Sequence, residues 1–328
     1  MNRLEINTRM IPVFITVGLF VLMYTFGLLR YDNFSSPQVF MNLFIDNAFL
    51  IIVAVGMTFV ILSGGIDLSV GSVIALTSMI VASLLMEGLP PWLVIPIALM
   101  VGPILGFLMG CCIHYFNLQP FIVTLAGMFL ARGLSFVISV QTITINDDFF
   151  SFMARTRIYI GDYFISISVI IALLVVVAAV FIAHYTKFGR NVYAIGGNEQ
   201  SALLMGLPVA KTKILVYTLS GFCASLAGIV FTFYMLSGYG LHANGFELNA
   251  IAAVVIGGTL LTGGVGYVAG SVIGVLILGT IQSLIVFEGS LSAWWTRIAI
   301  GLLLLLFIVL QRVIVLRTEA KKDTISTH

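Results

Sequence analysis

The sequence predicts an all-α polytopic membrane protein with about ten transmembrane helices, some of them broken at glycine-rich motifs. Composition, hydropathy and the spacing of polar segments support this fold class. Hydrophobic residues make up 60% of the 328 residues and charged residues only 9%, whereas a soluble domain typically has about 25% charged residues. The apolar residues fall in runs close to the roughly 20 residues needed to cross the hydrocarbon core. We expect a single transmembrane domain over residues 1–328.

The spans follow from the hydropathy and from the polar or glycine-rich segments between them. The first apolar run begins near residue 10 and the last ends near residue 312. An even number of spans places both termini on the same side of the membrane. The predicted spans are 10–29, 40–62, 69–86, 92–113, 120–140, 164–184, 212–237, 248–262, 266–287 and 294–312.

The distribution of lysine and arginine gives the orientation, because cytoplasmic loops of membrane proteins carry an excess of these residues. On the side opposite the N-terminus, only Arg30, Arg155 and Arg157 lie outside the spans or at their ends. We therefore predict that both termini are cytoplasmic and that a loop at about 141–163 faces the outside. The basic residues on the N-terminal side are Arg3, Arg9, Lys187, Arg190, Lys211, Lys213, Arg312, Arg317, Lys321 and Lys322.

The longest polar segment, about 185–213, predicts a short helix at the cytoplasmic face. Asn198 is a good N-cap, Glu199 places negative charge in the first turn, and Gly206 ends the helix after about two turns. The apolar side chains of this helix, Leu203 among them, need a surface to cover them. That surface is either this chain's own loops or a groove in a partner.

Two glycine-rich breaks of similar sequence interrupt the apolar runs. Residues 63–73, SGGIDLSVGSV, align without gaps with residues 262–272, TGGVGYVAGSV. Such breaks indicate discontinuous helices in transporters, because glycine allows sharp backbone turns and close helix approach. The alternative is tight helix packing with no direct role in a transport path. The residues of interest in the breaks are Gly64, Gly65, Asp67, Gly263 and Gly264.

Ionisable groups inside apolar spans are costly and are therefore candidates for a functional site. Asp46 and Arg132 lie roughly 9 and 12 Å below the outer ends of their spans. We expect these two residues to pair or to face a water-filled path together, with a purely structural ion pair as the alternative. Asn47, Gln119 and Thr124 are further candidates for lining the path, although each could instead bond to a neighbouring helix.

The sequence offers no pattern for catalysis or metal binding. It has no G-x-x-x-x-G-K-[ST] loop for ATP phosphates, and its four histidines and three cysteines are scattered. We therefore expect no catalytic residue, no metal site and no cofactor bound by this chain, so energy for transport would come from a partner. Nucleic acid is not an expected partner, because basic residues are not interleaved with aromatics.

Several stretches carry a family resemblance that extends in order over about residues 40–312. They are residues 61–73, 121–133, 188–198 with Ala202 and Gly206 following, and 254–266. Together they resemble the permease subunits of bacterial ribose-type sugar ATP-binding cassette (ABC) importers. DNAFL at 46–50 and GSLSAWWTRIAIG at 289–301 are most similar to one of the two permease subunits of the galactofuranose importer.

The resemblance implies a half-channel that pairs with a second permease subunit, identical or not, among the lipids of the bacterial inner membrane. It also implies cytoplasmic ATPase subunits that use ATP and Mg²⁺, a periplasmic sugar-binding protein landing on the 141–163 loop, and a monosaccharide substrate such as galactofuranose. In this family the GGN segment and its small helix contact the ATPase. This role would fall on Gly196, Gly197, Asn198, Glu199, Ala202, Leu203 and Gly206. The chain departs from the family at Asn249, where an acidic residue is frequent.

Two other functions stay open at this point. An ion-coupled secondary transporter acting without an ATPase would use Asp46, Asp67 or Glu247 as proton or sodium sites. An export or scaffolding subunit would share the fold and differ only in direction. The basic segment with its capped helix favours the importer, because a stand-alone carrier does not need such a segment.

Overall fold

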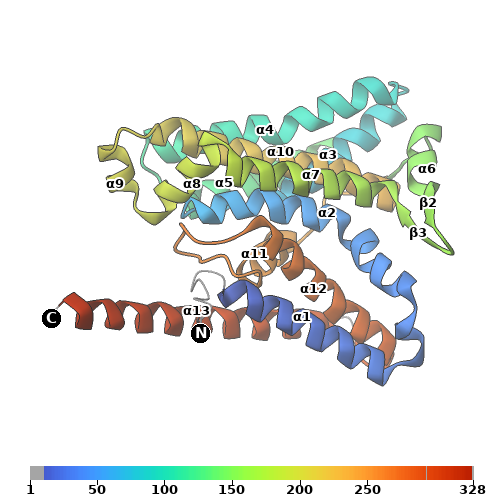
Figure 1. Ribbon diagram of the computed structural model, residues 1–328. Helices are drawn as coiled ribbons and strands as arrows, with labels where there is room; N and C mark the ends of the chain where they lie inside the picture. Colours follow the sequence, from blue (N-terminus) through green and yellow to red (C-terminus); the bar gives the residue numbers. More distant parts are fainter. Residues whose placement is uncertain (1–10, 293, 327–328) are drawn as a thin grey trace.

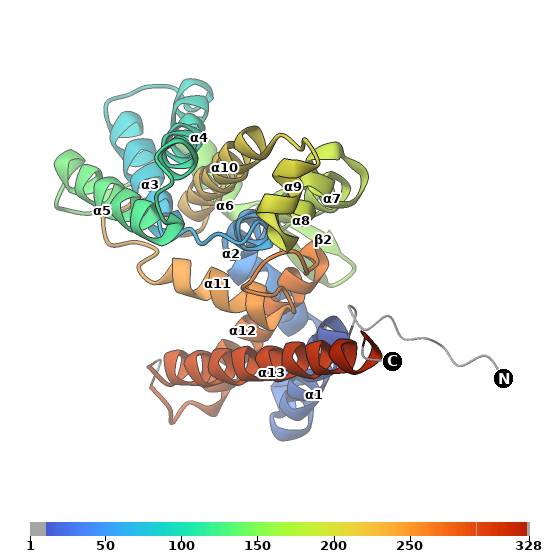
Figure 2. The same ribbon diagram turned by 90° about the vertical axis from the view of Figure 1, so that its left-hand side faces the viewer.

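The computed structural model describes residues 11–292 and 294–326, which fold into a bundle of helices with only short strands (Figures 1 and 2). The basic residues Arg3 and Arg9, used above to predict orientation, lie outside the described residues.

Eight of the described helices are long and apolar enough to cross a membrane. The chain is thus a multi-pass, almost entirely helical membrane protein, as the composition predicts. These helices are α1 (Ile11–Arg30), α2 (Pro37–Leu62), α4 (Pro91–Tyr115), α5 (Pro120–Ile138), α7 (Ile167–Tyr185), α10 (Val209–Met235), α12 (Val268–Glu288) and α13 (Trp294–Ser326).

Two of the predicted spans are shorter helices that adjoin the glycine-rich breaks. They are α3 (Val70–Met86), with 17 residues, and α11 (Phe246–Ile256), with 11 residues. At 1.5 Å per residue, α11 is about 17 Å long, roughly half the hydrocarbon thickness. The predicted span 248–262 is therefore too long: the helix ends at Ile256 because the chain turns at Gly258, whose φ is +92°.

The segment predicted as an outer loop, 141–163, contains regular structure. It includes the helix α6 (Asp148–Arg155), whose N-cap Asp147 accepts a hydrogen bond from the backbone N of Phe150. The strands β2 (Arg157–Ile160) and β3 (Tyr163–Ser166) form an antiparallel hairpin. The strand β1 (Ile143–Thr144) pairs with β4 (Ser237–Gly238), which ties this segment to the chain just after α10. The short 3-10 helix η2 (Asp32–Ser35) links α1 to α2.

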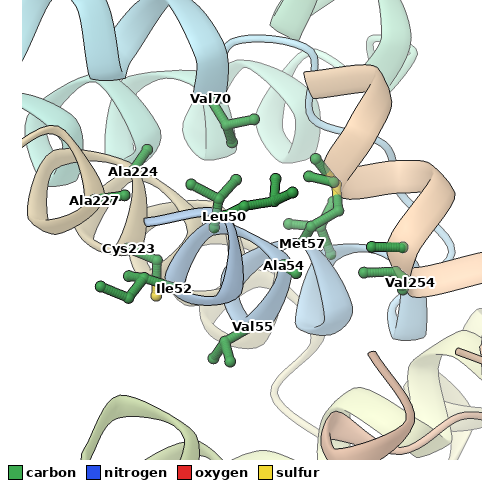
Figure 3. Close-up of a cluster of buried hydrophobic side chains, with 14 of the residues drawn as sticks. Leu50, Ile52, Ala54, Val55, Met57, Val70, Cys223, Ala224, Ala227 and Val254 are labelled. Atoms are coloured by element: carbon green, nitrogen blue, oxygen red, sulfur yellow. The ribbon is translucent and has the colours of Figure 1, made fainter. Parts of the chain in front are cut away.

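The helix α2 is the centre of the bundle. Residues 47–62 are all buried, and α2 packs against α7, α10, α11 and α12. Figure 3 shows its side chains against Cys223 and Ala224 of α10, Val70 of α3 and Val254 of α11. A helix that is apolar all round is expected to be buried all round. The first break follows α2 directly, so it lies at one end of this central helix.

The helices α1 and α13 lie at the periphery (Figure 2). Only 11% of the candidate span in each of them is buried, and side chains such as Leu22 and Leu302 are exposed. An apolar outer surface of this kind is suited to contact with lipid tails.

Candidate functional site

The capped helix predicted after Asn198 is present as α9 (Glu199–Leu204). The side-chain oxygen of Asn198 accepts a hydrogen bond of 2.8 Å from the backbone N of Ser201, so the predicted N-cap is confirmed. The helix has six residues and ends at Leu204, which agrees with the predicted length of about two turns. The chain then turns at Gly206, whose φ is +75°.

A second short helix, α8 (Lys187–Gly197), precedes α9 and was not predicted from the sequence. The hydroxyl of Thr186 accepts a hydrogen bond of 3.2 Å from the backbone N of Gly189 and caps the helix. Its side chains Val192 and Ile195 are buried. Tertiary burial of this apolar face outweighs the weak helix preference of a segment with three glycines.

One face of α9 is packed and the other is open. Ala202 is fully buried together with Ile195 and Val209. On the opposite side, the exposed fractions of Leu203, Leu204 and Met205 are 64%, 89% and 67%. The sequence left two possible surfaces to cover the apolar face of α9: this chain's own loops or a groove in a partner. The described loops of this chain do not cover it.

The position of α9 is fixed by an ion pair as well as by packing. The ammonium group of Lys213, in the first turns of α10, lies 2.6 Å from a carboxylate oxygen of Glu199. Glu199, the acidic residue predicted in the first turn of α9, therefore also links α9 to the long helix α10.

Glycines from three segments that are far apart in the sequence meet at the ends of α2 and α8. They are Gly64, Gly196, Gly197, Gly263 and Gly264. The backbone N of Gly264 donates a hydrogen bond of 2.9 Å to the carbonyl oxygen of Leu62. A Cβ atom on Gly196 would lie 1.7 Å from that same oxygen and 2.6 Å from the nitrogen of Gly264. A Cβ atom on Gly263 would lie 2.8 Å from the nitrogen of Gly64. We call this backbone contact between 62–65, 196–197 and 263–264 the glycine junction.

The glycine junction requires glycine for two physical reasons. The first is space, as the Cβ distances show. The second is conformation, because Gly64, Gly263 and Gly264 have φ angles of +81°, +87° and +74°, a region open to glycine at little cost. Gly197 is different, because a Cβ atom there would meet nothing within 4 Å. The two breaks are therefore in direct contact with each other and with α8.

A tyrosine adds a side-chain contact to the glycine junction. The hydroxyl of Tyr193, in α8, donates a hydrogen bond of 2.8 Å to the carbonyl oxygen of Gly266, in the second break. Burial, with a smaller contribution from Tyr267, raises the pKa of Tyr193 to about 12. The phenol therefore keeps its proton, and its role as donor, throughout the physiological pH range.

Replacement of Tyr193 by phenylalanine is expected to lower the free energy of unfolding by about 1 kcal/mol, the usual contribution of one hydrogen bond. Thermal unfolding of the purified protein in detergent measures this change. The replacement of Tyr185 by phenylalanine is a matched control, because the Tyr185 side chain is exposed at the end of α7. Equal stability of the two variants would contradict a structural role for the Tyr193 bond.

The carboxylate of Asp67 holds the first break against α10. Its Oδ1 accepts hydrogen bonds from the backbone N and the hydroxyl of Ser69, at 2.9 and 2.6 Å. Its Oδ2 accepts a hydrogen bond of 2.7 Å from the hydroxyl of Ser220, in α10. Asp67 is fully buried, and three donors satisfy it there, as a buried carboxylate requires.

Two adjoining cavities, of about 690 and 380 Å³, lie between α2, α10, α11, α12 and α13. Asp46 and Asn47, both predicted as path residues, line the smaller cavity. The side-chain amide of Asn47 also donates to the carbonyl oxygen of Leu43, at 2.9 Å. The two cavities share the wall residues Phe246, Asn249, Gln282, Thr296 and Ile300.

The predicted pairing of Asp46 with Arg132 is wrong. The guanidinium of Arg132 donates to the carbonyl oxygens of Gly240 and His242, at 2.6 and 2.9 Å. The partner of Asp46 is the hydroxyl of Tyr234, at 3.5 Å. Similar depth in the bundle was the only basis for the pairing, and the two side chains face different neighbours.

Gln119 and Thr124 do not line either cavity. The hydroxyl of Thr124 is buried and donates to the carbonyl oxygen of Pro120, at 2.8 Å, and also lies 3.3 Å from that of Ile66, in the first break. Gln119 is exposed at the start of α5. Thr124 therefore has the structural role that the sequence left open as the alternative to lining the path. Its hydroxyl bonds to backbone carbonyl oxygens instead.

Sequence reasoning missed several polar residues that do line the cavities: Tyr234, Gln282 and Thr296. Each lies within a helix that is long and apolar enough to cross a membrane. A search for uncharged polar side chains inside the predicted spans would have found them, since they too are unfavourable in lipid.

The fold and the site define a class of protein. A multi-pass helical bundle with two discontinuous helices, polar cavities between spans and a short exposed helix that follows a helix in contact with both breaks is a membrane transport permease. Residues 39–308 match the family model described as branched-chain amino acid transport system / permease component, and the chain belongs to this family.

Curated relatives agree with this assignment. The chain is 49% identical over 318 residues to the inner membrane ABC transporter permease protein YjfF of Escherichia coli (strain K12), with 96% of both chains covered. It is 44% identical to the fructose import permease protein FruG of Bifidobacterium longum (strain NCC 2705), covering 94% of this chain and 93% of the relative. It is 39% identical to the ribose import permease protein RbsC of Bacillus subtilis (strain 168), covering 90% and 91%. The chain is a permease subunit of this kind and not itself an enzyme, so the family resemblance seen in the sequence is confirmed.

No solved structure matches the chain significantly.

Proposed function

We propose that this chain is the permease subunit of an ABC importer for a monosaccharide, with galactofuranose as the first substrate to test. Relatives named for fructose and ribose import support a sugar as the substrate. The narrower choice of galactofuranose rests on the resemblance of residues 46–50 and 289–301 to a permease of that importer. The observation that carries the proposal is the uncovered apolar face of α9, which directly follows α8 and the glycine junction.

In this proposal α9 docks into a groove of a cytoplasmic ATPase subunit. Leu203, Leu204 and Met205 supply the apolar contacts, as helix-in-groove recognition requires. Movement of the ATPase on ATP binding is passed from α8 through the glycine junction to both breaks at once. The free energy comes from the ATPase, because a bound ligand shifts an equilibrium only by its preference between states.

The other proposed partners occupy the remaining surfaces. A periplasmic sugar-binding protein lands on α6 and the β2–β3 hairpin, where Phe152 and Tyr159 are exposed. A second permease subunit completes the path, and lipid covers α1 and α13. The protein resides in the inner membrane, with both termini and α9 on the cytoplasmic side, because the basic residues around α8 and α9 favour that side.

A secondary transporter is less well supported, because both carboxylate oxygens of Asp67 already accept hydrogen bonds from serine groups. A secondary transporter would also not explain the exposed apolar face of α9. The secondary-transporter hypothesis is one of the outcomes that the following test distinguishes.

We expect the double variant Leu203→Asp, Leu204→Asp to lose the ATPase while keeping the second permease. Charged side chains cannot enter an apolar groove without a large desolvation cost, so ATPase recovery should fall at least tenfold. The measurement is affinity purification of the tagged permease from mild detergent, with mass spectrometry of the proteins that accompany it.

The control variant is Ile160→Asp, on the β2–β3 hairpin at the opposite end of the bundle (Figure 1). Ile160 is also an exposed aliphatic residue, with an exposed fraction of 53%, and its replacement should leave ATPase recovery unchanged. Equal recovery with the α9 variant and the control would contradict the docking role. A wild-type protein that purifies alone, yet transports solute into vesicles without ATP, would establish the secondary transporter instead.

A further inference from the structure

The two adjoining cavities collect polar side chains from the membrane-spanning part of the bundle. Asp46 lies in the interior of α2 and Gln282 in the interior of α12, and both side chains are exposed rather than packed. Exposure of such groups to lipid would be costly. They are therefore expected to face water or a polar ligand, and the cavities provide that space.

The cavities have the size and chemistry of a site for a small polar molecule. Volumes of about 690 and 380 Å³ fall within the range of small-ligand pockets. Tyr234, Asn249, Gln282 and Thr296 offer both donors and acceptors. Phe49 and Phe246 line the smaller cavity, with their rings stacked at a centroid distance of 5.3 Å. Hydroxyl groups suit the polar side chains, and the C–H face of a sugar ring suits the aromatic wall.

The charge of the walls favours a neutral ligand over an ion. The smaller cavity has one carboxylate, Asp46, and the larger has one guanidinium, Arg297, which also lies over the ring of Trp294. These opposite charges balance across the adjoining spaces. Among the described residues, no group of histidine, cysteine and acidic side chains is arranged to hold a metal ion.

Two stretches far apart in the sequence meet at these cavities. Residues 46–50 supply Asp46, Asn47 and Phe49, and residues 289–301 supply Thr296 and Arg297. These are the same two stretches whose sequence resembles a permease of the galactofuranose importer. Both stretches thus contribute side chains to the walls of the two adjoining cavities.

We propose that the two adjoining cavities form a transit site for a neutral monosaccharide, and that this site gives the permease its own selectivity among sugars. Asp46, Tyr234 and Gln282 hydrogen-bond the sugar hydroxyl groups, and Phe49 and Phe246 face the ring. The inference rests on the proposed importer function and deepens it.

The test uses the complete transporter in proteoliposomes, with uptake of labelled galactofuranose, ribose and fructose measured side by side. The variants are Gln282→Leu and Asp46→Asn, and the control is Ser283→Ala, a neighbouring position in α12 that lines neither cavity. We expect uptake of the preferred sugar to fall about tenfold in the variants, the size expected for a lost hydrogen-bonding partner. The ratios between sugars should change, and ATPase recovery should stay unchanged.

A second measurement detects occupancy without transport. Gln282→Cys, with Cys111, Cys112 and Cys223 replaced by alanine, should react with a water-soluble maleimide, and galactofuranose should slow that reaction. Ile160→Cys, on the exposed β2–β3 hairpin outside the membrane-spanning helices, is the control that the sugar should not protect. This protection measurement does not depend on whether the Gln282→Leu variant folds.

The outcomes separate this inference from the function on which it rests. Unchanged ratios between sugars in both cavity variants, or equal slowing for every sugar, would overturn the transit site while the importer stands. Absence of sugar protection at Gln282→Cys would also overturn it. If no ATPase copurifies with the wild-type protein, the proposed importer function itself is contradicted.

Discussion

Replacement of Gly196 by alanine is expected to abolish transport and to lower the free energy of unfolding by about 3 kcal/mol or more. The new methyl group would lie 1.7 Å from the carbonyl oxygen of Leu62 and 2.6 Å from the nitrogen of Gly264. Both are backbone atoms, so no side-chain rotation relieves the clash and the glycine junction must open. Overpacking of this kind costs about 1–3 kcal/mol when side chains can adjust, and more when they cannot.

Gly197 provides a matched control in the adjacent position. A Cβ atom there meets nothing within 4 Å and its φ is not positive, so Gly197→Ala should retain transport and stability. ATP-dependent uptake and thermal unfolding of the two variants test this difference. If both variants behave alike, backbone contact at the glycine junction is not what joins α8 to the breaks.

Replacement of Asp67 by alanine is expected to destabilise the protein by about 3–5 kcal/mol, the range for removing one partner from a buried charged group. The change leaves the amide and hydroxyl of Ser69 and the hydroxyl of Ser220 without their acceptor in the core. Thermal unfolding in detergent, together with the yield of folded protein, measures the effect.

Asp67→Asn separates the structural role from a proton-carrying role. The amide keeps the shape and one acceptor oxygen, and the hydroxyl of Ser220 can accept from its NH₂ group. We therefore expect much of the stability, and transport, to return. A well-folded Asp67→Asn protein without transport would indicate that ionisation of this carboxylate is needed, as the secondary-transporter hypothesis requires.

Local features of the fold could be predicted from the sequence. The long apolar runs gave the spans, since a run such as 40–62 can bury its backbone only as a helix in a membrane. The cap at Asn198 depends on contacts within one turn of helix, and the breaks predicted at 63–73 and 262–272 depend on glycine. Each of these signals lies within a few residues of the structure that it determines.

Features that depend on distant contacts could not be predicted. The pairing of Asp46 with Arg132 was predicted only from their similar depth in the membrane. Depth does not specify which face of a helix a residue occupies. Arg132 bonds instead to the loop at 240–242. The convergence of the glycines joins residues more than a hundred positions apart, such as Leu62 and Gly264. The helix α8 was missed because burial of Val192 and Ile195, and not helix propensity, stabilises it.

The glycine junction also makes the segment carrying α9 exchangeable. Its contacts with the breaks are made to the carbonyl oxygen of Leu62 and to the backbone of Gly264, atoms that every polypeptide of this shape presents. A graft of residues 186–207 from a relative therefore needs glycine at position 196, a hydroxyl donor at position 193 and apolar side chains at the buried positions of α8 and α9. If α9 docks the ATPase as proposed, exchange of this one short segment is expected to change which ATPase subunit binds, without redesign of the membrane-spanning helices.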